Sequence, residues 1–209
     1  MLRAGASKYG TPPRQTSAAK ICIRVRRRPG RSSGVCCISV RVLGIDPGLS
    51  LTGYGCVDLA EGQADPVLVE AGVLRLARKR PMVFRLNQLH EDLTALIEEL
   101  KPDQMAVERL FSHYRHVRTA IRMGHARGVL LLAGQQHGLA ITELAATEVK
   151  KAVTGKGHAS KEQVQRAVMA QCALADVPEP PDVADAIAIA LCAARRLMQE
   201  QGDVPCDEA

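Results

Sequence analysis

The sequence of 209 residues is poor in aromatic side chains, with no Trp, two Phe and three Tyr. It also lacks any apolar run near the roughly 18 to 20 residues that a membrane-spanning helix needs. No sustained apolar segment follows the basic start, so the sequence indicates no secretory signal. These absences predict a soluble protein with no membrane partner, built around one ordinary α/β domain, and we expect it in the cytoplasm.

Cysteine is present, but its pattern excludes the usual cysteine-based frameworks. The seven cysteines are an odd number, and none of them forms a CxxC pair or a Cys and His set with zinc spacing. We therefore expect free thiols in a reducing compartment rather than disulfides or a zinc site.

Acidic residues are absent from the first 41 positions, which hold ten of the 28 Lys and Arg. The rest of the chain carries more acid than base, so the net charge of +6 is poor evidence for DNA binding. Residues 1–38 are rich in Arg, Pro, Gly and Ser, and this composition predicts a disordered basic leader. Three alternatives are an arm that holds DNA phosphates, an organellar transit peptide, and a chain start assigned too far upstream of a real start near Val40 to Val42. Residues 200–209 are expected to form an acidic disordered tail.

The segment between leader and tail has regular patterns of strands and helices. Three consecutive strands, separated by Gly and Pro, predict an antiparallel meander. Helices and two further strands then follow in alternation, which predicts a mixed five-stranded sheet with two parallel strands and helices on both faces. The predicted strands are 39–46, 52–59, 67–76, 104–108 and 140–145, and the helices are 82–100, 117–137, 147–155, 160–174 and 183–199, within a domain of residues 39–199.

Two carboxylates stand at predicted strand ends. Asp46 lies between an apolar strand and Pro47-Gly48, where an Asp is often a turn former and equally suits a nucleotide or metal site. Glu108 closes the fourth strand, and a solvated strand end is its simplest alternative. Because the first strand is the natural centre of such a sheet, with the fourth parallel beside it, both side chains are expected at the same edge.

Two further acids, Asp182 and Asp185, open the last helix three residues apart. They suit the N-cap and the third helical position of a capping box. The same spacing puts two like charges on one helical face, which is costly unless a cation lies between them. The apolar residues that follow predict that this face packs on the sheet. Four oxygen ligands without a thiolate suit two Mg²⁺ ions per subunit, or Mn²⁺ in their place.

Four segments in this order, LGIDPGLSLTGYG, AVERLF, GHARG and DVADAIAIA, resemble the RuvC-type Holliday junction resolvases over about residues 41–195. The first motif alone is weak, but the four together are specific. The resemblance implies an RNase H-like fold and makes Asp46, Glu108, Asp182 and Asp185 the catalytic, metal-binding acids. It also implies a homodimer that resolves four-way DNA junctions by symmetric paired nicks in recombination and repair, with RuvA and RuvB as partners.

Aromatic and basic residues after Glu108 are candidates for DNA contact. Phe111 and Tyr114 lie in a polar stretch with Arg115 and Arg118, which is a poor core and favours stacking on an unpaired base. The resemblance matches Phe111, but not Tyr114, to a family aromatic that enters the junction.

Lysines 150 and 161 are similar to family lysines near the scissile phosphate, and we add Lys161 to the catalytic set. A solvated helix face with Ser160 as N-cap is the alternative, and the neighbouring Lys151 leaves the choice between it and Lys150 open. The GHARG segment is assigned to helix packing, at the dimer interface.

Three other functions compete with junction resolution. The chain is too short for the duplicated domain of the ATPases and kinases that share its first motif, and a non-catalytic DNA-binding module would not need four acids. An RNase H-like metal-dependent nuclease for another structured DNA or RNA stays open as the alternative.

Overall fold

The structure of the protein is a computed structural model that describes residues 21–24, 39–60, 63, 65–109 and 117–202. Strands β2 (Ser39–Asp46), β3 (Leu51–Ala60) and β4 (Val67–Arg75) form an antiparallel meander. Strands β5 (Gln104–Glu108) and β6 (Ala140–Leu144) continue the sheet in parallel on the other side of β2. The predicted mixed sheet, with its first strand at the centre, is confirmed.

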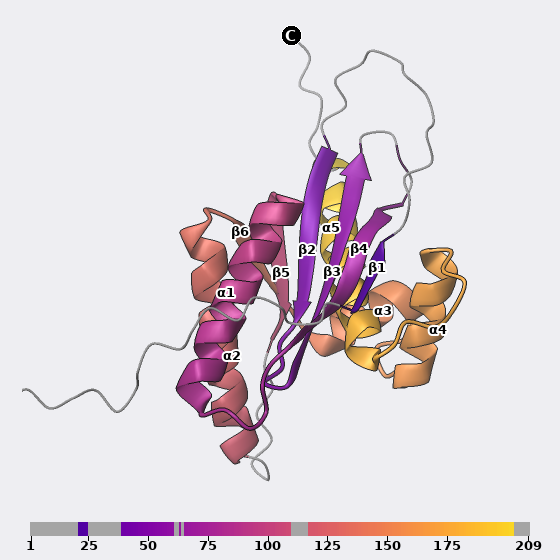
Figure 1. The fold of residues 1–209 in the computed structure, drawn as a ribbon. Helices are drawn as coiled ribbons and strands as arrows, with labels where there is room; N and C mark the ends of the chain where they lie inside the picture. The colour runs from indigo at the N-terminus through magenta and orange to yellow at the C-terminus, as the bar shows by residue number, and fades with distance from the viewer. Residues whose placement is uncertain (1–20, 25–38, 61–62, 64, 110–116, 203–209) are drawn as a thin grey trace, which may run out of the picture.

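The helices cover both faces of the sheet, so the fold has three layers (Figure 1). Helices α1 (Met82–Leu100) and α2 (Val117–Gln136) lie on one face. Helix α5 (Pro181–Gly202) lies on the other face, with α3 (Ala146–Thr154) and α4 (Lys161–Gln171) packed against it. Among the described residues, no helix combines the length and the apolar character that crossing a membrane requires.

A sixth strand, β1 (Ile21–Arg24), pairs antiparallel with the outer edge of β4. The sequence analysis did not predict it, because these residues fall within the stretch expected to be disordered. β-branched residues suit a strand, and the edge of β4 offers unpaired backbone groups. Helix α5 also runs to Gly202, three residues beyond the predicted boundary. The rest of the predicted leader and tail, residues 1–20, 25–38 and 203–209, lies outside the described residues.

The cysteines whose side chains are described, Cys56, Cys172 and Cys192, are free thiols. Burial raises the pKa of the Cys56 thiol to about 12 and that of Cys172 to about 11. A protonated, buried thiol is a poor nucleophile and a poor metal ligand, so these side chains act as small apolar residues of the core.

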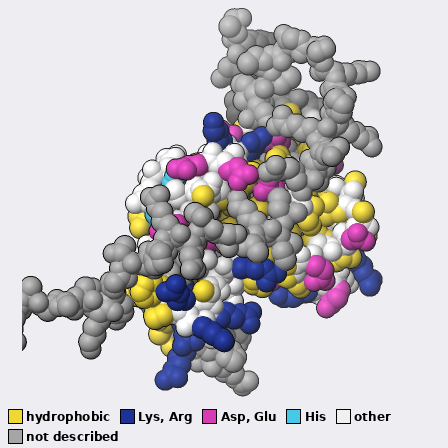
Figure 2. Space-filling model, in the orientation of Figure 1, with side chains coloured by type: hydrophobic (Ala, Val, Ile, Leu, Met, Phe, Trp, Pro, Cys, Tyr) yellow, Lys and Arg dark blue, Asp and Glu magenta, His cyan; other side chains and the backbone are white. Residues whose placement is uncertain are grey.

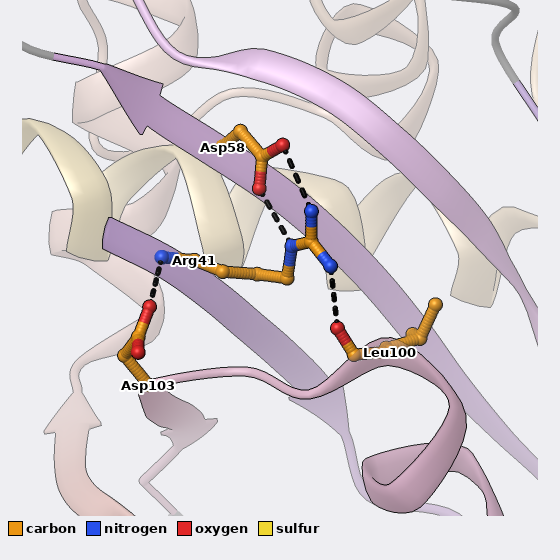
Figure 3. Close-up of polar contacts among 4 residues, drawn as sticks. All are labelled: Arg41, Asp58, Leu100 and Asp103. Carbon is orange, nitrogen blue, oxygen red and sulfur yellow. Dashed lines mark hydrogen bonds and ion pairs between the residues drawn. The ribbon is translucent and has the colours of Figure 1, made fainter. Parts of the chain in front are cut away.

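An arginine near the start of β2 joins four elements at the end of the sheet remote from Asp46 (Figure 3). The Arg41 guanidinium donates two hydrogen bonds to the Asp58 carboxylate, at 2.6 and 3.0 Å, and one to the Leu100 carbonyl at 2.6 Å. The Asp103 carboxylate accepts from the Arg41 amide at 2.7 Å, and the Asp103 amide donates to the Arg41 carbonyl at 2.9 Å. These bonds tie β2 to β3, to the end of α1 and to the start of β5, so they set the alignment of β5 beside β2.

Helix α5 lies directly on the backbone of β2 and β3 because three glycines face it. A Cβ on Gly44 would lie 2.5 Å from the Ala186 carbonyl oxygen, and one on Gly53 would lie 2.1 Å from that of Asp182. Gly55 meets the backbone of α5 in the same way. Real Cβ atoms do not approach backbone so closely, so only glycine permits this docking.

We predict that Gly44→Ala destabilises the protein by about 3 kcal/mol, since overpacking a tight core costs about 1–3 kcal/mol or more. The methyl group would collide with backbone atoms that cannot rotate away, and α5 would have to lift from the sheet. Urea unfolding followed by far-UV circular dichroism measures the change. An unchanged unfolding midpoint would contradict the proposed contact.

Candidate active site

Asp46 and Glu108 extend from neighbouring parallel strands toward the same face of the sheet. The pairing of β2 with β5 ends at Ile45 and Val107, so the two acids occupy the next step of the register. Side chains alternate between the faces of a strand, and Gly44, two residues before Asp46, faces α5. Both carboxylates therefore lie at one edge of the sheet, on the side that α5 covers.

The start of α5 delivers the other two acids to this edge. Pro181 is the first helical residue. This position suits proline, because a backbone N–H there would have no acceptor within the helix. The suggestion that Asp182 is the N-cap is therefore wrong, since Asp182 lies inside the first turn. Its backbone carbonyl lies over Gly53, which pairs with Asp46 in the β2–β3 register. Asp185 follows on the same helical face.

The electrostatics of Asp46 place all four acids in one cluster. Burial raises the pKa of Asp46 to about 8, and the negative charges of Asp185, Glu108 and Asp182 add to this shift. The positive charge of Lys161 offsets only part of the effect. The site therefore concentrates negative charge in a poorly solvated position, where it favours a proton or another cation.

Two lysines border the acids and partly compensate their charge. The Lys161 ammonium lies 3.6 Å from the Asp185 carboxylate. Burial raises the pKa of Glu108 and of Asp185, whereas the charges of Lys150 and Lys161 lower both. The nearby charge of Asp182 raises the pKa of Asp185 further.

The structure answers which of the two neighbouring lysines faces the acids. Lys150 is half-buried, and its charge acts on the site, whereas Lys151 is exposed. Ser160 is the N-cap of α4 and forms a full capping box with Gln163. Its capping role is compatible with the position of Lys161 beside Asp185.

The chemistry of the acids fits a hard divalent cation, although the carboxylates are not arranged as a finished ligand set. Within the described ranges, no three His, Cys, Asp or Glu side chains lie close enough together to hold a metal ion as they stand. The cluster is nevertheless entirely of carboxylate oxygens, the ligands that Mg²⁺ and Mn²⁺ prefer. Burial first, and then the charges of the neighbouring acids, raise the pKa of Asp46, Glu108 and Asp185, and the two lysines offset only part of this effect.

The remaining predicted DNA contacts have mixed outcomes. Phe111, Tyr114 and Arg115 lie outside the described residues, and Arg118 is exposed in the first turn of α2. Within GHARG, the Arg127 guanidinium pairs with Glu143 of β6 at 2.7 Å, so part of this segment packs α2 onto the sheet.

The sequence analysis missed the role of the site's glycines in helix docking. It used glycine only as a separator of the predicted strands, and Gly48 does serve in the turn after Asp46, because a Cβ on it would lie 1.7 Å from the Leu51 carbonyl oxygen. Gly53 and Gly55 instead receive α5. Their spacing of two along a strand, which puts both on one face, was the available signal.

A comparison with protein families identifies the domain that carries this cluster. The family model described as "Crossover junction endodeoxyribonuclease RuvC" matches residues 42–193, which include all four acids and both lysines. The chain belongs to the RuvC family. The resemblance drawn from the four sequence motifs is thereby confirmed.

Individual relatives agree with this assignment. The RuvC crossover junction endodeoxyribonuclease of Rhodopirellula baltica is 48% identical over 168 residues, which is 80% of this chain and 89% of the relative. A solved Thermus thermophilus RuvC structure is 32% identical, with a TM-score of 0.68 over 77% of this chain and 97% of that one. The same T. thermophilus protein in complex with a Holliday junction substrate has a TM-score of 0.69, at 32% identity, over 77% of this chain and 96% of that one. The predicted RNase H-like fold class is confirmed as well.

The raised pKa of Asp46 predicts how stability depends on pH in EDTA. The folded state holds the Asp46 proton more tightly than the unfolded chain does, so stability is highest at acid pH and falls between about pH 4 and pH 8. Asp46→Asn removes this cost, and its melting temperature is expected to exceed that of the wild type at pH 8 but not at pH 4.

Thermal unfolding across this pH range in EDTA measures the effect, with Glu98→Gln, an exposed acid on α1, as the control. If the melting temperatures of the wild type and Asp46→Asn changed in parallel with pH, the raised pKa of Asp46 would be contradicted.

Proposed function

We propose that this RuvC-family chain is a structure-selective endonuclease that resolves four-way DNA junctions by symmetric paired nicks, in recombination and repair. The observation that carries the proposal is the cluster of four acids and two lysines at the ends of β2 and β5. The relative of known structure with a Holliday junction substrate supports the choice of DNA.

Asp46, Glu108, Asp182 and Asp185 would hold the divalent metal, two Mg²⁺ per subunit with Mn²⁺ as a substitute. When bound, such ions lower the pKa of an attacking water and stabilise the leaving oxygen. The four carboxylates repel one another, and a bound cation would remove this repulsion. The repulsion therefore favours metal binding.

Lys161 and Lys150 face the same acids and would hold the scissile phosphate against them. Lys161 is exposed and lies at the first residue of α4, so its ammonium is free to reach a phosphate beyond Asp185. In this role the lysines orient the phosphate and neutralise its charge as it approaches the acids.

The surface around the site suits a polyanion. Strands β2 and β5 end at the same side of the molecule at which α1 and α2 begin, and Lys and Arg side chains gather there (Figure 2). The exposed basic residues before α1 and in the first turns of α2 are Arg78, Lys79, Arg80, Arg118 and Arg122. They would contact phosphates of the junction arms, and Phe111, Tyr114 and Arg115 stay predicted DNA contacts.

A homodimer would supply the two active sites that paired nicks need, and we propose α2 as its interface. Val117, Ile121 and Leu132 are each more than half exposed, and they recur on one face of the helix with Gly124 and Gly128. The two glycines have open space beside them, which permits close approach of a second helix. RuvA and RuvB as partners, and the cytoplasm as location, stay predictions from the family and from the sequence.

Cleavage of a labelled four-way junction and a matched linear duplex, with Mg²⁺, Mn²⁺ or EDTA, tests the proposed function. We expect paired symmetric nicks on the junction alone, lost in EDTA and in Asp46→Asn, which should keep junction binding. Equal cutting of both substrates would point to another nucleic acid substrate, and normal cutting by Asp46→Asn would rule out the site.

Two adjacent lysines allow a matched comparison of roles. Lys150→Ala is expected to lower the cleavage rate at least about tenfold, the effect of removing one electrostatic contact at a reacting phosphate. Lys151→Ala, one residue away and exposed, should stay within about twofold of the wild type. Single-turnover cleavage of the junction measures both, and equal losses in the two variants would contradict the assignment of Lys150.

The dimer interface is tested by placing a charge in the apolar stripe. Ile121→Asp should convert the dimer to a monomer, because a buried unpaired carboxylate is costly at an interface. Sedimentation equilibrium measures the change, and Val67→Asp, an exposed valine on β4, is the control. An Ile121→Asp protein that remains dimeric would exclude this face.

A further inference from the structure

The turn that follows Asp46 is held by a buried hydroxyl group. Thr52 of β3 is fully buried, and its Oγ1 donates to the Gly48 carbonyl at 2.7 Å and accepts from the Gly48 amide at 3.3 Å. One side chain thus satisfies both backbone groups of the residue at the tip of the turn.

A second side chain holds the same turn from α1. The Arg85 guanidinium donates to the Leu49 carbonyl, and the Leu76 amide donates to the Ser50 carbonyl at 3.1 Å. The Nε of Arg85 is buried and has no hydrogen-bond partner among the described residues. Burying part of the Arg85 guanidinium costs free energy, and its hydrogen bond to the Leu49 carbonyl compensates only part of that cost. We therefore read the contact as a specific constraint on this turn.

Both ties come from the side of the sheet opposite the acids. Gly53 faces the start of α5, so Thr52, its neighbour along β3, points to the other face, as Tyr54 does in the core beneath α1. Helix α1, which carries Arg85, covers that face. Neither side chain is among the charges that shift the pKa of Asp46.

Asp46 needs such support because it is the last residue of β2 and three carboxylates repel it. Repulsion at a strand end would displace the carboxylate unless the next residues are fixed. On the basis of the proposed function, we propose that Thr52 and Arg85 are positioning residues that clamp the turn of residues 47–50 and so hold Asp46 in place for cleavage.

Two Thr52 variants and a control variant at Thr94 test the clamp. Thr52→Val keeps the shape but removes both hydrogen bonds, and we expect the single-turnover rate on the junction to fall about 10- to 100-fold, as small misplacements of reacting groups do. The dissociation constant for the junction should change less than about twofold, because the charges of the site are unaltered. Thr52→Ser restores the hydroxyl and should recover most of the rate.

The matched control is Thr94→Val on α1, whose buried hydroxyl has no hydrogen-bond partner among the described residues. It should cut at close to the wild-type rate. Normal cutting by Thr52→Val, or an equal loss in Thr52→Ser or Thr94→Val, would overturn the positioning role. Arg85→Met removes the hydrogen bond to the Leu49 carbonyl and should also lower the cleavage rate.

Hydrogen exchange followed by mass spectrometry measures how firmly the turn is held, and it does not require DNA cleavage. Peptides covering residues 46–51 should exchange faster in Thr52→Val than in the wild type, with no such change in Thr94→Val. If the wild type itself fails to cut junctions, the proposed function fails, and the exchange result alone upholds or overturns the clamp. Unchanged exchange in Thr52→Val would overturn it.

Discussion

The contact between the first turns of α5 and the bare backbone of β2 and β3 is the constraint on which the site depends. At Gly44, Gly53 and Gly55 no side chain separates helix from sheet, so the α5 backbone approaches the strand backbone directly at these positions. The apolar residues that follow Asp185, residues 186–194, are all buried. The packing therefore brings Asp182 and Asp185 over the strand ends, where Asp46 and Glu108 already lie side by side.

This packing assembles a cluster that is unfavourable by itself. Burial and mutual repulsion raise the pKa of Asp46 to about 8, and Lys150 and Lys161 offset only part of that cost. The rest of the domain must supply the stability that the cluster removes, through the apolar layers on both faces of the sheet and the Arg41 network at its far end. Such a conflict between local electrostatics and fold is expected where a site has to bind a cation.

The fold could be predicted from the sequence to a large extent because its patterns are strong. Helix α1 begins and ends where the spacing of its leucines predicts, and β2 matches its predicted bounds. The parallel pairing that puts Asp46 beside Glu108 followed from the order of strands and helices. Strand β1 was missed because four residues of weak pattern form a strand only against an existing edge.

Other features of the site depend on which faces meet in three dimensions. Whether Lys150 or Lys151 faces the acids depends on the rotation of α3 against α5, which adjacent positions in a sequence do not determine. The docking role of Gly53 and Gly55 likewise requires knowing that α5 crosses β3 there. The start of α5 was misplaced by two residues, because a proline at the first helical position and an acid at the N-cap both suit the same sequence.

The most direct test of the account is the pKa of the Asp46 carboxyl group, followed by ¹³C NMR against pH in EDTA and again with saturating Mg²⁺. The account predicts a titration near pH 8 in EDTA and a shift to well below neutral pH when Mg²⁺ is present, because the cation replaces the proton. An ordinary titration near pH 4 in EDTA, or one that Mg²⁺ leaves unchanged, would contradict it.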